Sequence, residues 1–244
     1  MAVSTPLQLH FDPAGELRTA ARDCEADVFF RAYGNTREEF DEEYGPYEHS
    51  SAFIAVSEPG GDVVAACRLI VPSEAGLKSL RDIARPPWSV DGNRSARAAG
   101  LAPAATLDIA TIGVRPGLGG TGLWAVALYH AIVMATRANN MPYVVMIMDE
   151  RARKLLTSIG CATQALPGTG PGPYLGSPAS TPLWANVPNM MDRQRRENPE
   201  GYRLVSQGMG LDGISVPAPS AFVLRDRTRL TSGVGSGVGV LERA

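Results

Sequence analysis

The sequence predicts a mixed α/β fold class, in which helices flank a central mixed, mostly antiparallel sheet and a C-terminal extension follows. Two observations predict it. Two apolar segments, residues 51–57 and 62–71, are joined by Glu58-Pro59-Gly60-Gly61, a turn signal placed where a β-hairpin needs one. A third strand-like segment then runs through a glycine-rich loop into a long helical segment and a buried strand, which together form a β-loop-α-β unit.

The individual elements follow from apolar periodicity and from residues that begin or end helices. In residues 16–32, for example, Leu17, Cys24 and Val28 share one helical face. Asp149 is a suitable N-cap and Gly160 a suitable end for the last helix. In order, the sequence predicts a strand at residues 6–11, helices at 16–32 and 36–44, strands at 51–57, 62–71 and 106–114, a helix at 123–140, a strand at 143–148 and a helix at 150–160.

Glycine and proline are dense between residues 167 and 188, so this stretch predicts no long regular element. We therefore divide the chain into a core at residues 1–167, an extension at 168–230 packed on that core, and a Gly/Ser-rich flexible tail at 231–244. Within the extension, residues 190–198 are basic and predict a helix.

Charge and composition exclude several classes of protein. Lys and Arg number 23 against 25 Asp and Glu, so the chain has no global basic footprint for non-specific nucleic-acid binding. The longest mostly apolar stretch, residues 123–135, is shorter than the ~20 residues that span a membrane. The N-terminus has no signal-peptide pattern, and Cys24, Cys67 and Cys161 are odd in number and far apart. These features predict a soluble cytoplasmic protein with reduced thiols.

The glycine-rich loop at residues 117–122 is the strongest functional signal. A strand that stops at glycines and continues as a helix points several backbone N–H groups at one spot, with the helix dipole behind them. The loop is therefore either an anion cradle or simply a tight turn. The sequence lacks the Gly-Lys-Ser/Thr of a P-loop, and the preceding hairpin disfavours a dinucleotide-binding βαβ unit.

These residues resemble the GNAT (Gcn5-related) N-acyltransferases, in which a strand ending in Val-x-Pro leads into a pyrophosphate loop. Here Val114-Arg115-Pro116 leads into the loop, and Gly120 and Gly122 match its two glycine positions. Gly117 departs from the basic residue usual at the first position. The resemblance implies an acyl-CoA or phosphopantetheine thioester bound by Ile112, Val114, Arg115, Gly117, Gly119, Gly120, Thr121 and Gly122.

The N-terminal half is similar to one GNAT branch, the LuxI-type acyl-homoserine-lactone synthases and N-acyl amino acid synthases. The similarity rests on Glu38-Glu39-Phe40-Asp41, on the Gly-x-Val-x-x-x-x-Arg-Leu pattern of residues 61–69, and on Asp108, six residues before the Val of the loop. Two departures argue against lactone synthesis from S-adenosylmethionine. No tryptophan precedes Trp88, and Thr111 stands where the branch has an arginine.

Asp108 and Arg68 are the candidate catalytic residues. Asp108 lies in an apolar strand, where a carboxylate is costly without a partner or a task. It is either the general base that deprotonates the attacking amine or a structural carboxylate, at a sheet edge or paired with an arginine such as Arg68. Arg68 either orients Asp108, binds a substrate carboxylate, or extends to solvent.

Glu38, Phe40, Asp41 and His49 are the candidate acceptor residues: the carboxylates of Glu38 and Asp41 would bind a cationic amine, and His49, just before a strand, is a candidate for acid/base work. The alternative for the acidic residues is a solvated helix face anchored by Phe40. The three histidines lack metal-ligand spacing, so no metal site is predicted. The Tyr that many family members use as general acid falls at Leu156, which leaves that role unassigned.

The resulting prediction is an N-acyltransferase that moves an acyl group from acyl-CoA or an acyl-carrier protein to a small-molecule amine by direct attack. No Ser or Cys stands in a nucleophile pattern with a base. Two alternatives stay open: a non-catalytic thioester-binding protein, and transfer from aminoacyl-tRNA through a patch of Arg193, Arg195, Arg196 and Arg203. The helix at 190–198 covers the acceptor site, contacts a carrier protein, or forms a homodimer arm.

Overall fold

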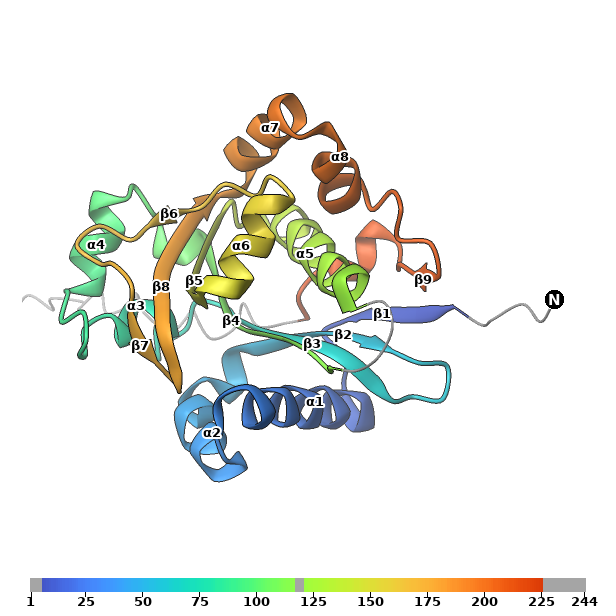
Figure 1. Cartoon of the computed structure of the whole chain (residues 1–244), viewed down its shortest axis with the longest axis horizontal. Helices are drawn as coiled ribbons and strands as arrows, with labels where there is room; N and C mark the ends of the chain where they lie inside the picture. The colour runs from blue at the N-terminus through green and yellow to red at the C-terminus, as the bar shows by residue number, and fades with distance from the viewer. Residues whose placement is uncertain (1–5, 117–120, 226–244) are drawn as a thin grey trace, which may run out of the picture.

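The structure is a computed structural model that describes residues 6–116 and 121–225 (Figure 1). The tail at 231–244 and loop residues Gly117, Gly119 and Gly120 lie outside the described residues. No described helix is long and apolar enough to cross a membrane.

One central sheet organises the molecule, with the strand order β6-β8-β5-β4-β3-β2-β1-β9 and β7 paired to β8. Pairing is antiparallel except between β4 and β5 and between β1 and β9, which confirms the predicted mixed, mostly antiparallel sheet. The strands are β1 (Leu7–Phe11), β2 (Ser51–Ser57), β3 (Val63–Ile70), β4 (Thr106–Val114), β5 (Tyr143–Asp149), β6 (Gln164–Ala165), β7 (Gly172–Tyr174), β8 (Ser177–Asn186) and β9 (Ile214–Ser215).

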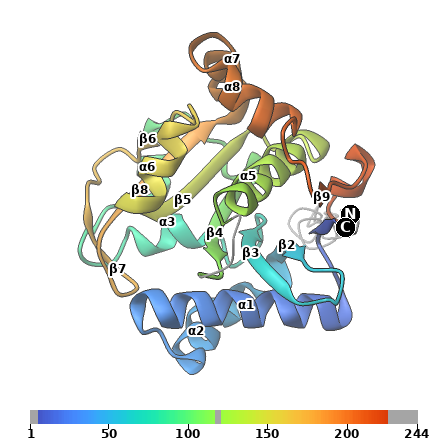
Figure 2. The ribbon, with the colours of Figure 1, turned by 45° about the vertical axis from the view of Figure 1, so that its right-hand side comes forward.

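Helices cover both faces of the sheet (Figures 1 and 2). On one face α1 packs Ala21 and Cys24 against Phe53 and Ala66 of the hairpin. On the other face the apolar α5 packs against β2, β3 and β4 in the main core. The helices are α1 (Gly15–Tyr33), α2 (Arg37–Tyr44), α3 (Lys78–Asp82), α4 (Gly92–Ala98), α5 (Thr121–Ala138), α6 (Glu150–Ser158), α7 (Val187–Glu197) and α8 (Pro199–Gly201).

Strands β4 and β5 separate part-way along their length. They pair only from Thr106 to Asp108, against Tyr143 to Val145. The pairing of β4 with β3 also shifts, from Arg68 opposite Thr111 to Leu69 opposite Ile109, so Ala110 is the extra residue of a β-bulge. A bulge bends its strand. Beyond Asp108 the two strands therefore diverge and leave a gap in the sheet.

The ten-residue strand β8 corrects the expectation that residues 167–188 hold no long regular element. β8 pairs with β5 from Ser180 to Asn186, while on its outer edge β7 pairs near Ser177 and Ser180 and β6 near Leu183. The carbonyl of Pro182 accepts a hydrogen bond from Leu166 on this outer edge. The missing N–H of Pro182 faces the same edge, between the two short strands, so the ladder to β5 is intact.

Candidate active site

A pocket lies in the gap between the separated strands. Its volume is about 60 Å³. Its lining comes from β4, β5, the start of α6, the end of α1 and the turn between β7 and β8. The lining residues are Phe29, Tyr33, Tyr44, Ile109, Ala110, Thr111, Ile112, Ile147, Met148, Asp149, Ala152, Tyr174, Leu175, Ser177 and Ser180.

Tyr33 and Asp149 bridge the two sides of this pocket. The Tyr33 hydroxyl, on the last residue of α1, donates a hydrogen bond to one carboxylate oxygen of Asp149. The other oxygen accepts the N–H of Ala152 at 2.7 Å, so Asp149 caps α6 as predicted. Burial and the bond to Asp149 raise the pKa of Tyr33, which keeps the phenol protonated at neutral pH.

Backbone groups of β4 also face the gap. The N–H of Arg115 bonds the carbonyl of Val64 at 2.9 Å, toward β3. Because N–H groups alternate between the two edges of a strand, the N–H groups of Ile112 and Val114 point to the opposite edge, where β5 has moved away. The gap therefore holds backbone donors, hydroxyl groups and a carboxylate beside apolar side chains such as Ile109, Ile147 and Met148.

Arg68 belongs to a buried cluster next to the pocket. Its guanidinium donates to both carboxylate oxygens of Glu25 on α1, at 2.6 and 2.9 Å, and reaches Glu48 at 3.2 Å. Thr111, which lines the pocket, donates its hydroxyl to Glu25 and accepts the N–H of Arg68. Glu25 thus joins α1 to β3 and β4 behind the pocket.

Asp108 is fully buried and does not line the pocket. Its carboxylate accepts the N–H and the hydroxyl of Ser79 at 2.6 and 2.7 Å. Burial raises its pKa to about 7, against the opposing effect of the Ser79 hydrogen bonds. The alternative in which Asp108 pairs with Arg68 is wrong, because Arg68 is paired with Glu25 and Glu48.

Lys78 forms a second buried cluster that sequence reasoning missed. Its ammonium group bonds the carboxylates of Glu43 and Asp82, and the hydroxyl of Tyr174 at 3.0 Å. Tyr174 in turn donates to Asp82 at 2.6 Å. The i, i+4 spacing of Lys78 and Asp82 was the only signal in the sequence, and it is also typical of exposed helices.

The ring of Tyr44 connects the two clusters. The Arg68 guanidinium lies 4.7 Å and the Lys78 nitrogen 4.9 Å from its centroid, distances typical of cation–π contacts. Tyr44 also lines the pocket. Both clusters therefore support the same wall of the gap.

Comparison with solved structures identifies this architecture. FeeM, an N-acyl amino acid synthase from uncultured soil microbes, superposes with a TM-score of 0.58 at 12% identity, over 78% of this chain and 95% of FeeM. BjaI, a CoA-dependent acyl-homoserine lactone synthase, gives 0.56 at 13% identity, over 89% and 96%. The AHL synthase LasI gives 0.51 at 13%, over 74% and 89%. The chain has a GNAT-like fold. No protein-family model and no curated protein matches the sequence.

Within this GNAT-like fold, those of the predicted donor-binding residues that the structure describes lie at the end of β4 and the start of α5. Ile112 and Val114 lie on its free edge, Arg115 follows and lies 3.6 Å from Asp27, and α5 begins at Thr121. Gly122, in the first turn of α5, has open space around it. Their role in donor binding stays a prediction.

The residues predicted to bind the acceptor lie outside the pocket. Glu38 and His49 are exposed, and Asp41 pairs with Arg22 at 2.9 Å on the surface. Phe40 is buried against Phe29 and Tyr44 and anchors α2. Phe40 also lines a neighbouring pocket of about 470 Å³ whose charged lining residues are Glu39, Glu42, Glu43, Asp82, Arg81 and Arg85. Their role as acceptor ligands stays a prediction.

The three cysteines are buried free thiols. Burial raises the pKa of Cys24 and of Cys161 to about 12, and that of Cys67 well above its usual value. Because the thiolate is the nucleophile, these cysteines are unreactive in the folded protein.

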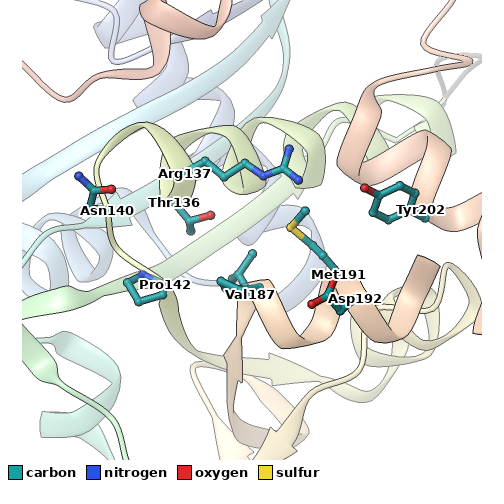
Figure 3. Close-up of a pocket in the computed structure, with 9 residues that line it drawn as sticks. Thr136, Arg137, Asn140, Pro142, Val187, Met191, Asp192 and Tyr202 are labelled. Carbon is teal, nitrogen blue, oxygen red and sulfur yellow. The ribbon is translucent and has the colours of Figure 1, made fainter. Parts of the chain in front are cut away.

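A larger pocket of about 490 Å³ lies elsewhere in the GNAT-like fold, between α5 and α7 (Figure 3). Arg137 and Thr136 of α5 face Met191 and Asp192 of α7 across it. Pro142 lines this pocket just before β5 begins, whereas Asp149 lines the first pocket where β5 ends. The length of β5 separates the two, about 20 Å for a strand of this size.

The basic segment of the extension forms α7, close to the predicted range 190–198. Three arginines of the predicted tRNA patch have acidic neighbours: Arg193 pairs with Glu197 at 2.7 Å, Arg203 with Glu200 at 2.6 Å, and Arg195 lies 3.9 Å from Asp192. These carboxylates offset much of the positive charge that phosphate contacts require.

Proposed function

We propose that the protein is an N-acyltransferase that moves an acyl group from a CoA or phosphopantetheine thioester to the amine of a small molecule. The observation that carries the proposal is the gap where the bulged β4 leaves β5. It presents backbone N–H groups, a phenol and a carboxylate around one pocket. The GNAT-like fold shared with FeeM, BjaI and LasI supports it.

In this proposal the amine nitrogen attacks the thioester carbonyl carbon directly. The C–N bond forms, the C–S bond breaks, and the proton lost by the amine is balanced by the proton gained by the thiol. In the proposal the N–H groups of Ile112 and Val114 polarise the carbonyl, which is the role of an oxyanion hole. Asp149 accepts the proton of the amine, and Tyr33, which is hydrogen-bonded to Asp149, supplies a proton to the sulfur.

Asp108 as general base stays a separate prediction. A general base acts within about 2.6–3.2 Å of the proton it removes, or through one water. Asp108 is fully buried and both its hydrogen bonds go to Ser79, so a proton from the amine reaches it only through a relay. Its position favours support of the β4 bend over direct proton transfer.

Two measurements on the wild-type chain test the proposal. Calorimetry with CoA tests donor binding, and release of free thiol from acetyl-CoA in the presence of amino acids, polyamines and amino sugars tests transfer. We expect both binding and amine-dependent release. Binding without product from any amine favours the non-catalytic alternative, and absence of both contradicts the proposal. Transfer that ribonuclease abolishes would establish an aminoacyl-tRNA donor instead.

A further inference from the structure

The pocket between β4 and β5 is small. Its volume is about 60 Å³, against about 490 Å³ for the pocket between α5 and α7. In the same measure one water needs about 10–15 Å³, so the gap has room for roughly four to six heavy atoms, which an acyl group of two to four carbons with its carbonyl oxygen fills. Resting on the proposed acyl transfer, we infer that this chain selects short acyl groups of about two to four carbons.

Packed side chains close the deep end of the gap. Ile109 of β4 and Met148 of β5 line the pocket and are buried to more than nine-tenths. Tyr129 of α5 and Leu156 of α6 belong to the same core cluster and are equally buried. Protein interiors are close-packed and have few voids. A longer alkyl chain would therefore have to displace core side chains.

The chemistry of the lining points in the same direction. Seven of the fifteen lining residues carry a hydroxyl or carboxylate group: Tyr33, Tyr44, Thr111, Tyr174, Ser177, Ser180 and Asp149. Several of these groups are bonded within the protein and tie the walls in place: Tyr33 donates to Asp149, Thr111 to Glu25 and Tyr174 to Asp82. A long alkyl chain that widened the gap would break such bonds without replacing them, which is unfavourable. An acetyl-sized group leaves them intact.

Affinity for inert donor analogues tests the inference without requiring the acceptor. The probes are S-ethyl-, S-butyl-, S-hexyl- and S-decyl-CoA, measured by calorimetry on the wild-type chain. In an apolar channel, affinity rises about four-fold for each buried methylene. We expect no gain beyond butyl and a decyl affinity at least ten-fold below ethyl. Affinity that is flat or rises from butyl to decyl overturns the inference, whereas failure of CoA and all analogues to bind overturns the proposed function itself.

A pair of methionine variants locates the limit. Met148→Ala shortens a pocket-lining side chain, while Met146→Ala removes the same atoms from the same face of β5 outside the pocket. We expect Met148→Ala to raise the hexyl-to-ethyl affinity ratio at least ten-fold and Met146→Ala to leave it unchanged. Equal ratios in the two variants contradict the role of Met148.

A variant that narrows the pocket between β4 and β5 tests the inference even if both methionine variants unfold. Ala152→Val adds two methyl groups to the pocket wall on α6. We expect it to lower butyl affinity at least five-fold while ethyl affinity changes less than two-fold. An equal loss for both analogues contradicts the inference.

Discussion

Two buried charged clusters meet at the ring of Tyr44, and they balance their charges differently. In the Arg68 cluster the buried pair is matched one to one, Arg68 with Glu25, and Arg18 and Arg22 both lie within 3.9 Å of Glu48 at its edge. In the Lys78 cluster, Lys78 bonds Glu43 and Asp82, and Asp108 lies close enough for its pKa to be affected by both Lys78 and Asp82.

This difference assigns the two clusters different tasks. A balanced, bidentate arginine pair holds its geometry over a wide pH range, which suits a cluster that fixes α1, β3 and Thr111. In the Lys78 cluster, burial, with a smaller contribution from Asp82, raises the pKa of Asp108, against the opposing effects of Ser79 and Lys78. Asp108 is therefore the carboxyl of this cluster that we expect to take up a proton.

The largest expected effect comes from unbalancing the Arg68 cluster. Glu25→Gln leaves a buried guanidinium without its main partner, which costs about 3–5 kcal/mol of the free energy of unfolding. Asp41→Asn is the control, because the Arg22–Asp41 pair is exposed and such pairs contribute roughly 0–1 kcal/mol. Denaturant unfolding measures the free energy of unfolding of both variants. Similar small losses in the two would show that Glu25 does not stabilise the fold.

Asp108→Asn should change how stability depends on pH. The folded pKa of about 7 lies above the unfolded value near 3.8, so the carboxyl stabilises the fold below pH 4 and loses this contribution as pH rises to 7. Relative to the variant, the wild type should lose up to about 4 kcal/mol over that window, at ~1.4 kcal/mol per pH unit. Unfolding curves at pH 4.5, 6 and 8 check this, and a constant difference would contradict the proton assignment.

The Asp108→Asn variant also distinguishes a structural role of Asp108 from a role as general base. Because Asp108 is enclosed, we expect kcat of Asp108→Asn to stay within about ten-fold of the wild type, with any loss following the change in stability. A general base contributes roughly 10²-fold or more. A loss of that size with an unchanged melting temperature, smaller at high pH, would establish Asp108 as the base and contradict the supporting role.

A smaller effect is expected from the hydroxyl that bridges the Lys78 cluster. Tyr174→Phe removes one hydrogen bond to Asp82 and one from Lys78, which should cost about 1–3 kcal/mol. Tyr202→Phe is a matched control at the other pocket. Thermal unfolding measures the stability of both variants. An equal loss of stability in the two would show that the hydrogen bonds of Tyr174 do not stabilise the fold.

No effect at all is expected at the cysteines. Because Cys24, Cys67 and Cys161 are buried with raised pKa values, none should carry an acyl group during turnover. To check this, the reaction with acetyl-CoA is quenched during turnover and the protein is analysed by mass spectrometry. Detection of an acylated cysteine would contradict direct attack and indicate a covalent acyl-enzyme intermediate.

The core of the fold could be predicted because its patterns are local. The hairpin turn at residues 58–61, the period of α1 and the Asp149 cap each lie within one segment, and β2 and β4 have the predicted bounds. Strand β8 could not be predicted from its prolines, because only its pairing partners show that Pro182 faces an interrupted edge.

The site was less predictable because its residues meet only through the fold. Asp108 and Arg68 were singled out individually, but their partners, Ser79 and Glu25, come from α3 and α1. No spacing in the sequence links Tyr33 with Asp149, which lie 116 residues apart.

The central claim is that donor and amine meet where β4 leaves β5. Ala152→Trp would fill that gap, and Asp192→Trp would place the same side chain in the pocket between α5 and α7. The measurement is amine-dependent thiol release from acetyl-CoA by both variants, with folding checked by circular dichroism. We predict loss of at least 10²-fold for Ala152→Trp and less than three-fold change for Asp192→Trp. Retained activity in a folded Ala152→Trp variant, or loss confined to Asp192→Trp, would contradict the account.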